Sequence, residues 1–79
     1  MDFWASWCGP CKMLAPVLHE FAAEHAELKV GKVNVDEEMD LAMRFGVSSI
    51  PTLILFKNGK AVKTSIGFVP KAQLESFAL

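Results

Sequence analysis

The only two cysteines of this chain, Cys8 and Cys11, lie in the segment Trp-Cys-Gly-Pro-Cys-Lys at residues 7–12. Cysteines separated by two residues occur in redox-active dithiols, in zinc sites and in structural disulfides. A disulfide that closes so short a loop removes little conformational entropy from the unfolded chain. A purely structural crosslink is therefore the weakest of the three interpretations.

A zinc site would need two further ligands, and the histidines of the chain are His19 and His25. On a helix that follows the cysteines, His19 would lie roughly 12 Å beyond Cys11, and His25 further still. Zinc ligands must converge to about 2 Å from one ion. The spacing therefore argues against metal at the cysteine pair. We expect no metal site, and we interpret both histidines as partly exposed helix residues.

Redox chemistry suits the position of the pair. Cys8 is predicted to lie where a strand enters a helix, so unpaired backbone donors and the helix dipole favour its thiolate, and Lys12 adds positive charge nearby. Cys11 falls on the same side of the first turn, at a spacing that a disulfide can bridge. We expect Gly9 to let the turn close without a Cβ clash, and Pro10 to fit a first turn where its missing N–H is not needed.

The elements that would position this pair can be predicted from hydrophobic spacing. The apolar run from Asp2 to Ala5 stops at Ser6, as expected for a buried strand that leads into a helix. Apolar residues at positions 14, 17, 18 and 21 repeat with helical spacing, which predicts an amphipathic helix over residues 10–27. The valine-rich residues 28–35 predict a strand covered by helices.

The second half of the chain predicts a helix, a hairpin and a last helix. Asp36 can cap the first of these helices and Gly46 can end it. Strands at 52–57 and 60–66 flank Asn58-Gly59, a strong signal for a hairpin. A short helix is predicted from residue 71 to about residue 77. We therefore expect an α/β fold of the order β-α-β-α-β-β-α, with a four-stranded mixed sheet flanked by helices.

Composition indicates a single packed domain over residues 1–79. Hydrophobic residues make up 52% of the chain, and the net charge is only −1. This near-neutral balance argues against nucleic acid and membrane surfaces as partners. No apolar run is long enough to span a bilayer, and the first residues lack the basic region of a signal peptide. We therefore expect a cytoplasmic protein.

Six short segments, in order along the chain, resemble the thioredoxin family: DFWA, WCGPCK, KVNVD, IPT, FKNG and the glycine at position 67. The resemblance covers essentially the whole chain, which makes it far more specific than a Cys-x-x-Cys pair alone. It implies a thioredoxin-like fold and thiol–disulfide oxidoreductase activity on disulfide-containing proteins. The resemblance also implies no bound cofactor, because the electrons would come from NADPH through a flavin-containing thioredoxin reductase.

The resemblance also implies roles for individual residues. Cys8 would attack a substrate disulfide, and Cys11 would resolve the mixed disulfide. Because Gly9-Pro10 brings no histidine between the cysteines, we expect a reductant rather than an oxidant. Asp2 would correspond to a buried carboxylate that takes the proton of Cys11, and Lys32 to its charged partner.

Substrate binding would involve the residues around the pair. Pro51 would correspond to a cis-proline that faces the cysteines. The residues that would form an apolar surface for varied substrate segments are Trp7, Gly9, Pro10, Ile50, Ile66 and Gly67.

Compared with typical thioredoxins, this chain lacks the family's usual first strand and helix. An alternative function is therefore a truncated or engineered scaffold that serves as a folding or binding module with little turnover. The strand predicted at 28–35 would then be an exposed edge, so we expect a monomer or a weak edge-strand dimer.

Overall fold

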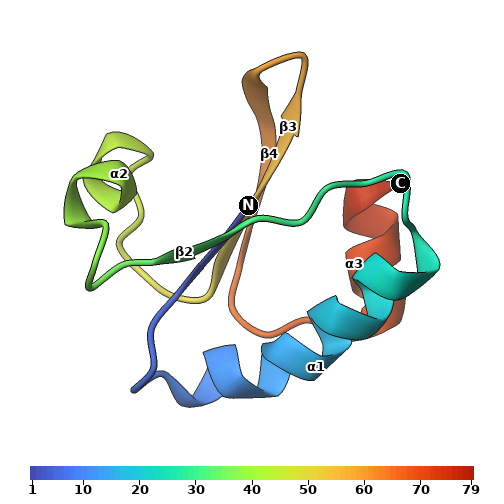
Figure 1. The fold of residues 1–79 in the computed structure, drawn as a ribbon, viewed down its shortest axis with the longest axis horizontal. Coiled ribbons are helices and arrows are strands. Elements are labelled where there is room, and N and C mark those ends of the chain that lie inside the picture. The colour runs from blue at the N-terminus through green and yellow to red at the C-terminus, as the bar shows by residue number, and fades with distance from the viewer.

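A computed structural model describes all residues 1–79 and has the predicted order of elements (Figure 1). A four-stranded mixed sheet contains the strands in the order β2-β1-β3-β4. The elements are β1 (Asp2–Trp4), α1 (Gly9–Glu24), β2 (Lys32–Asn34), α2 (Met39–Arg44), β3 (Thr52–Lys57), β4 (Lys60–Ile66) and α3 (Lys71–Ala78).

The short strand β1 lies in the middle of the sheet and carries the chain directly to the cysteines. It pairs in parallel with β2, with Asp2 opposite Lys32, and antiparallel with β3, with Asp2 opposite Leu53. Pairing on both sides fixes the end of β1, and with it the start of α1.

The hairpin of β3 and β4 forms as predicted. Asn58 and Gly59 both have positive φ, 54° and 78°, which is the backbone that a tight two-residue turn between antiparallel strands requires. A register shift between Leu55 and Phe56 interrupts the ladder. The register up to Leu55 still brings Ile66, the last residue of β4, opposite Thr52.

The predicted strand at residues 28–35 is correct only in part. The structure has strand β2 at Lys32–Asn34 alone, because the ladder with β1 begins with Asp2 opposite Lys32. Gly31 still accepts a hydrogen bond from the backbone N–H of Asp2, at 2.8 Å. Residues 28–30 have no residue of β1 opposite them, so a favourable sequence does not become a strand there.

The start of α2 also differs from the prediction. The helix begins at Met39 after Glu38, and no side chain caps it. Asp36 instead belongs to a turn in which its backbone N–H donates to the side-chain oxygen of Asn34, at 2.9 Å. Asp36 is thus two residues too early to cap the helix, and its carboxylate is free to contact another part of the chain.

Alternation along β3 divides the core between the two faces of the sheet, as expected for helices on both sides. Leu53 packs with residues of α1 and α3, including Phe21 and Leu74. Ile54 packs on the other side with Phe3 and Ala42, the latter from α2. Figure 1 shows α1 and α3 side by side, with α2 well away from them. No helix is both long enough and apolar enough to cross a membrane.

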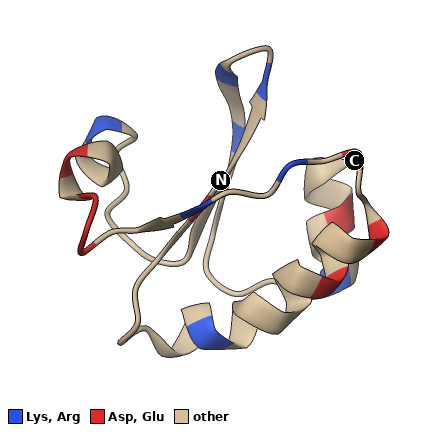
Figure 2. Cartoon of the chain, viewed as in Figure 1, with Lys and Arg blue, Asp and Glu red and all other residues tan.

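The charged residues of the β3–β4 hairpin are all basic, whereas acidic residues predominate where the end of α1 meets α3 (Figure 2). The segment from Ala5 to Cys11, which contains the cysteine pair, carries no charged residue at all. The nearest charge along the chain is Lys12 in the first turn of α1. The segment that contains the cysteines is therefore built from uncharged residues.

Candidate redox site

Cys8 and Cys11 are joined by a disulfide at the N-terminus of α1. Their Cα atoms are 5.2 Å apart, within the usual range for disulfides. Cys8 is the N-cap of the helix, and its sulfur accepts a hydrogen bond from the backbone N–H of Cys11, at 3.2 Å. This donor and the positive end of the helix dipole would also stabilise a Cys8 thiolate after reduction.

The two cysteines are almost equally buried but occupy different positions, Cys8 at the N-cap of α1 and Cys11 within the helix. Cys8 is 4% exposed and Cys11 is 6% exposed in the disulfide state, so exposure alone does not identify the attacking sulfur. Cys8 is flanked by the exposed residues Trp7 and Gly9. Cys11 faces a cavity of about 300 Å³, which is also lined by Asp2.

Gly9 is not required for the steric reason that the sequence suggested. A Cβ built at this position meets no atom within 4 Å, and the φ angle is not positive. The expectation that a side chain would clash in the turn is therefore wrong. Pro10 does lie in the first turn of α1, where its lack of an N–H costs no hydrogen bond.

Asp2 is buried beneath the cysteine pair, with only 5% of its surface exposed. Its Oδ1 atom has no hydrogen-bond partner within the protein. Burial raises the pKa of this carboxyl, and the positive charge of Lys32 opposes the rise only in part. Lys32 is directly opposite Asp2 in the β1–β2 ladder, while its own side chain is exposed.

One cavity connects the buried carboxyl with the second cysteine. Asp2, Cys11, Lys32 and Trp4 all line it. The indole nitrogen of Trp4, like Oδ1 of Asp2, is buried and has no partner in the protein. A cavity of this size with polar groups on its wall can hold water. The sequence predicted Trp4 only as part of a buried strand and did not reveal its place in this cavity.

The Ile50–Pro51 peptide bond is cis, as the family resemblance implied. The carbonyl oxygen of Ile50 lies 3.7 Å from the Cys8 sulfur. The carbonyl oxygen of Pro51 accepts a hydrogen bond from the backbone N–H of Gly67, at 2.8 Å. This bond ties the segment after β4 to the proline, and the neighbouring Ile66 is 64% exposed.

Trp7 is the largest exposed apolar side chain at the site. It is 68% exposed, and its indole nitrogen donates to Oδ2 of Asp36, at 2.9 Å. Asp36 is therefore a site residue that sequence reasoning missed, since it was interpreted as a helix cap. The contact of Asp36 with Trp7 joins residues 29 positions apart and is seen only in the structure. The one signal in the sequence was that Asp36 ends the segment KVNVD, which matches the family.

The structure thus brings most of the predicted site residues into two groups. Cys11, Asp2 and Lys32 line one cavity. Cys8 contacts Ile50 on the outer side, and Pro51 is linked to Gly67 and Ile66 through backbone hydrogen bonds and the β3–β4 ladder. Trp7, Gly9 and Pro10 are exposed beside Cys8.

Comparison with known proteins agrees with this geometry. The family model described as Thioredoxin matches residues 1–79. The chain is 60% identical over 77 residues to the thioredoxin of Alicyclobacillus acidocaldarius and 56% identical over 78 residues to that of Haemophilus influenzae. These matches cover 96% and 98% of this chain, and 73% of each relative.

A solved structure gives the same result for the fold. The crystal structure of thioredoxin NaTrxh from Nicotiana alata matches with a TM-score of 0.90 and 44% identity, over 95% of this chain. The chain spans less than two thirds of that thioredoxin, 64% of its length. Because the family model matches residues 1–79 and the bacterial relatives share more than half of the aligned residues, this protein belongs to the thioredoxin family of thiol–disulfide oxidoreductases.

Proposed function

We propose that this protein, acting as a single domain, reduces the disulfides of other proteins in two exchange steps. The Cys8 thiolate attacks one sulfur of the substrate disulfide, forms a mixed disulfide and releases the other substrate sulfur as a thiolate that takes a proton. Cys11 then attacks the Cys8 sulfur, so that the Cys8–Cys11 disulfide forms and the substrate leaves as a dithiol. Two electrons pass from the protein to the substrate.

The observation that carries the proposal is the hydrogen bond from the Cys11 N–H to the Cys8 sulfur at the N-terminus of α1. Only the sulfur of Cys8 occupies the N-cap position, where backbone donors and the helix dipole lower a thiol pKa. Cys8 therefore takes the role of nucleophile. Cys11 takes the role of resolving thiol, because it lies one turn further along the helix and lines the cavity beneath it.

Asp2 takes the proton that Cys11 must lose before it attacks. A carboxylate with a raised pKa is a better base for a thiol than an ordinary surface aspartate, because the pKa values of donor and acceptor are closer. Lys32 keeps the burial from raising the pKa of Asp2 further. Water in the shared cavity would connect the two groups.

A substrate segment binds in extended form over the outer side of Cys8. The carbonyl of Ile50 next to the cis-proline is a backbone acceptor at the attacking sulfur, and Trp7 and Ile66 supply apolar contact area. Gly9, Pro10, Pro51 and Gly67 add small or rigid surface that leaves room for varied side chains. Such a surface suits many substrate sequences rather than one.

The proposed cycle closes when thioredoxin reductase returns electrons from NADPH through its flavin. We place this protein in the cytoplasm, where thiols are kept reduced. There it would serve electron transport and redox homeostasis. The protein itself would hold no cofactor. The absence of a histidine between the cysteines supports the direction toward reduction.

Trapping with a Cys11→Ser variant tests the order of attack. This variant should accumulate a mixed disulfide between Cys8 and a substrate such as insulin, because the resolving thiol is gone. The matched Cys8→Ser variant should trap little. Trapping only by Cys8→Ser would reverse the assignment, and a wild-type chain that folds but does not reduce insulin would support the scaffold alternative instead.

A further inference from the structure

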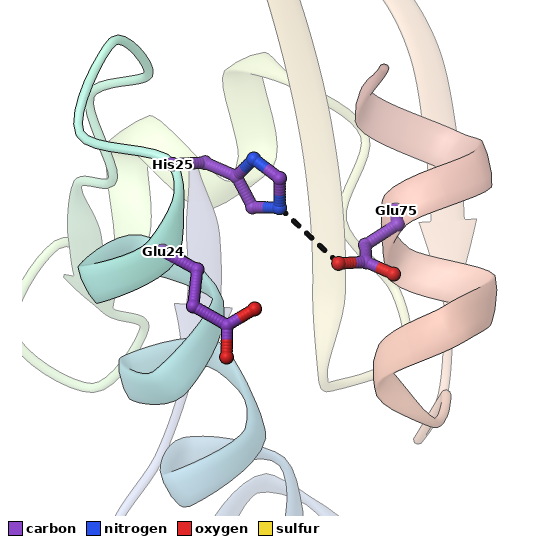
Figure 3. Close-up of side chains that lie close together, drawn as sticks. All are labelled: Glu24, His25 and Glu75. Carbon is purple, nitrogen blue, oxygen red and sulfur yellow. Dashed lines mark hydrogen bonds and ion pairs between the residues drawn. The ribbon is translucent and has the colours of Figure 1, made fainter.

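Three metal-ligating side chains meet at the opposite end of α1 from the cysteines. Glu24 is the last residue of α1, His25 is its C-cap, and Glu75 belongs to α3. One ligand atom from each lies within 4.8 Å of the others. Figure 3 shows both carboxylates directed to the space beside the His25 ring. The 16 residues of α1, roughly 24 Å of helix, separate this cluster from Cys8.

The His25 ring is held in one orientation by its neighbours. Its Nε2 atom lies 3.2 Å from Oε2 of Glu75, and its Nδ1 atom lies 3.5 Å from Oε1 of Glu27. The ring packs against Phe21 with centroids 4.7 Å apart, and the side chain is only 19% exposed. In metal-binding histidines one nitrogen faces the ion and the other is usually near a carboxylate or carbonyl. At His25 the Nε2 atom faces the Glu75 carboxylate and Nδ1 has the Glu27 carboxylate as its nearest acidic partner.

A cation here would have to compete with Lys71, which forms an ion pair with Glu24. Lys71 also contacts Glu20, at 3.3 Å, so it keeps a carboxylate partner when Glu24 turns away. Ion pairs between exposed side chains contribute little to stability, so the loss is small. The carbonyl end of α1 carries a partial negative charge at this position, which favours a bound cation.

We propose that Glu24, His25 and Glu75 bind a divalent transition-metal cation, with Zn²⁺ as the best fit. Around a tetrahedral zinc ion with bonds of about 2 Å, ligand atoms lie roughly 3.3 Å apart. The His25–Glu75 distance already satisfies this, and a rotation of the Glu24 side chain brings in the third ligand. Water takes the remaining position. The imidazole ligand selects zinc over Mg²⁺ and Ca²⁺, which prefer oxygen ligands alone.

Sequence reasoning set His25 aside because it compared the histidines only with the cysteines. The missing partner, Glu75, is 50 residues away along the chain and meets His25 only because α3 packs beside α1. The ion would join the end of α1 to α3 and would stabilise the folded chain, since the site does not exist in the unfolded one.

Zinc titration of the oxidised protein tests the site. With Cys8 and Cys11 in their disulfide, no thiolate competes for the ion. By calorimetry, the wild type should bind one Zn²⁺ and the His25→Gln variant at least tenfold more weakly, whereas His19→Gln, which changes an exposed histidine on the same helix, should bind within twofold of the wild type. Zn²⁺ should also raise the thermal midpoint of the wild type but not of His25→Gln.

A Glu24→Gln variant provides a second measurement if His25→Gln folds poorly, because Glu24 is exposed and its loss leaves the Phe21 contact intact. It should also weaken binding at least tenfold. The proposal is overturned if the oxidised wild type shows no saturable zinc binding, if Mg²⁺ competes equally, or if His19→Gln loses as much affinity as His25→Gln. Insulin reduction, which depends on the far end of α1, reports separately on the redox function.

Discussion

At the scale of single residues, Asp2 is an ionisable side chain in a buried position that disfavours its charged form. Its carboxyl is buried, one oxygen has no partner, and burial raises its pKa despite the charge of Lys32. Such a group destabilises the fold whenever it is ionised, and each pKa unit corresponds to about 1.4 kcal/mol. A costly residue of this kind is expected where the chemistry of the site requires it.

The variant Asp2→Asn should therefore be more stable than the wild type at pH 7. The native state binds the Asp2 proton more tightly than the unfolded state does, so this residue's contribution to stability falls as the pH rises from about 3.8 through the raised native pKa. The gain from Asp2→Asn should vanish below that range. Urea unfolding of the oxidised wild type and variant between pH 3 and pH 8 measures this difference in the free energy of unfolding. A variant that is less stable than the wild type at pH 7 would show that the ionised carboxylate is held favourably.

The contact between Trp7 and Asp36 predicts an effect on activity without a large effect on stability. Removing the acceptor in Asp36→Ala should change the free energy of unfolding by less than about 1 kcal/mol, because the pair is exposed. It should release Trp7 and lower kcat/KM for insulin reduction, mainly through KM. Asp36→Asn, which keeps an acceptor oxygen, should recover most of the activity, while Glu37→Ala should behave like the wild type. Equal losses in the Ala and Asn variants would contradict this role.

At the scale of elements, the order of strands and helices could be predicted because local signals are strong in this chain. Helical spacing at Leu14, Leu18 and Phe21 and the Asn58-Gly59 turn depend only on neighbouring residues. The length of β2 could not be predicted, because a strand extends only as far as its partner does. The contact of Asp36 with Trp7 and the place of Trp4 in the cavity could not be predicted for a similar reason: a contact across 29 residues and a shared cavity leave no periodic pattern.

The two glycines of the hairpin and the active-site turn should respond differently to alanine. Gly59→Ala should destabilise the protein by about 1 kcal/mol, because Gly59 has a φ of 78° and an L-residue is strained there even in open space. Gly9→Ala should be neutral or slightly stabilising, since the position is helical, open and of ordinary φ. Thermal unfolding of both variants measures the difference in stability. If Gly9→Ala lost as much stability as Gly59→Ala, a side chain at position 9 would clash in the turn after all.

At the scale of the whole molecule, β2 is one of the two edges of the sheet and is a surface through which copies of the chain could associate. The edge strand has only three residues, and Lys32 projects from it into solvent. Short, charged edges pair poorly with other strands. We therefore expect a monomer at micromolar concentration and at most weak, reversible dimers at millimolar concentration. Sedimentation over that range tests this, and a stable dimer at a few micromolar would show a larger contact surface than β2 provides.

The central position of β1 has a consequence for synthesis on the ribosome. β1 is made before both of its neighbours: β2 follows about 30 residues later and β3 about 50 residues later. The cysteines and α1 therefore leave the exit tunnel before Lys32 and Pro51 can take their places around them. Because β1 has a partner strand on each side, the sheet can be completed only after β3 has emerged. Until then the nascent chain exposes its two thiols without the structure that would control their reactivity.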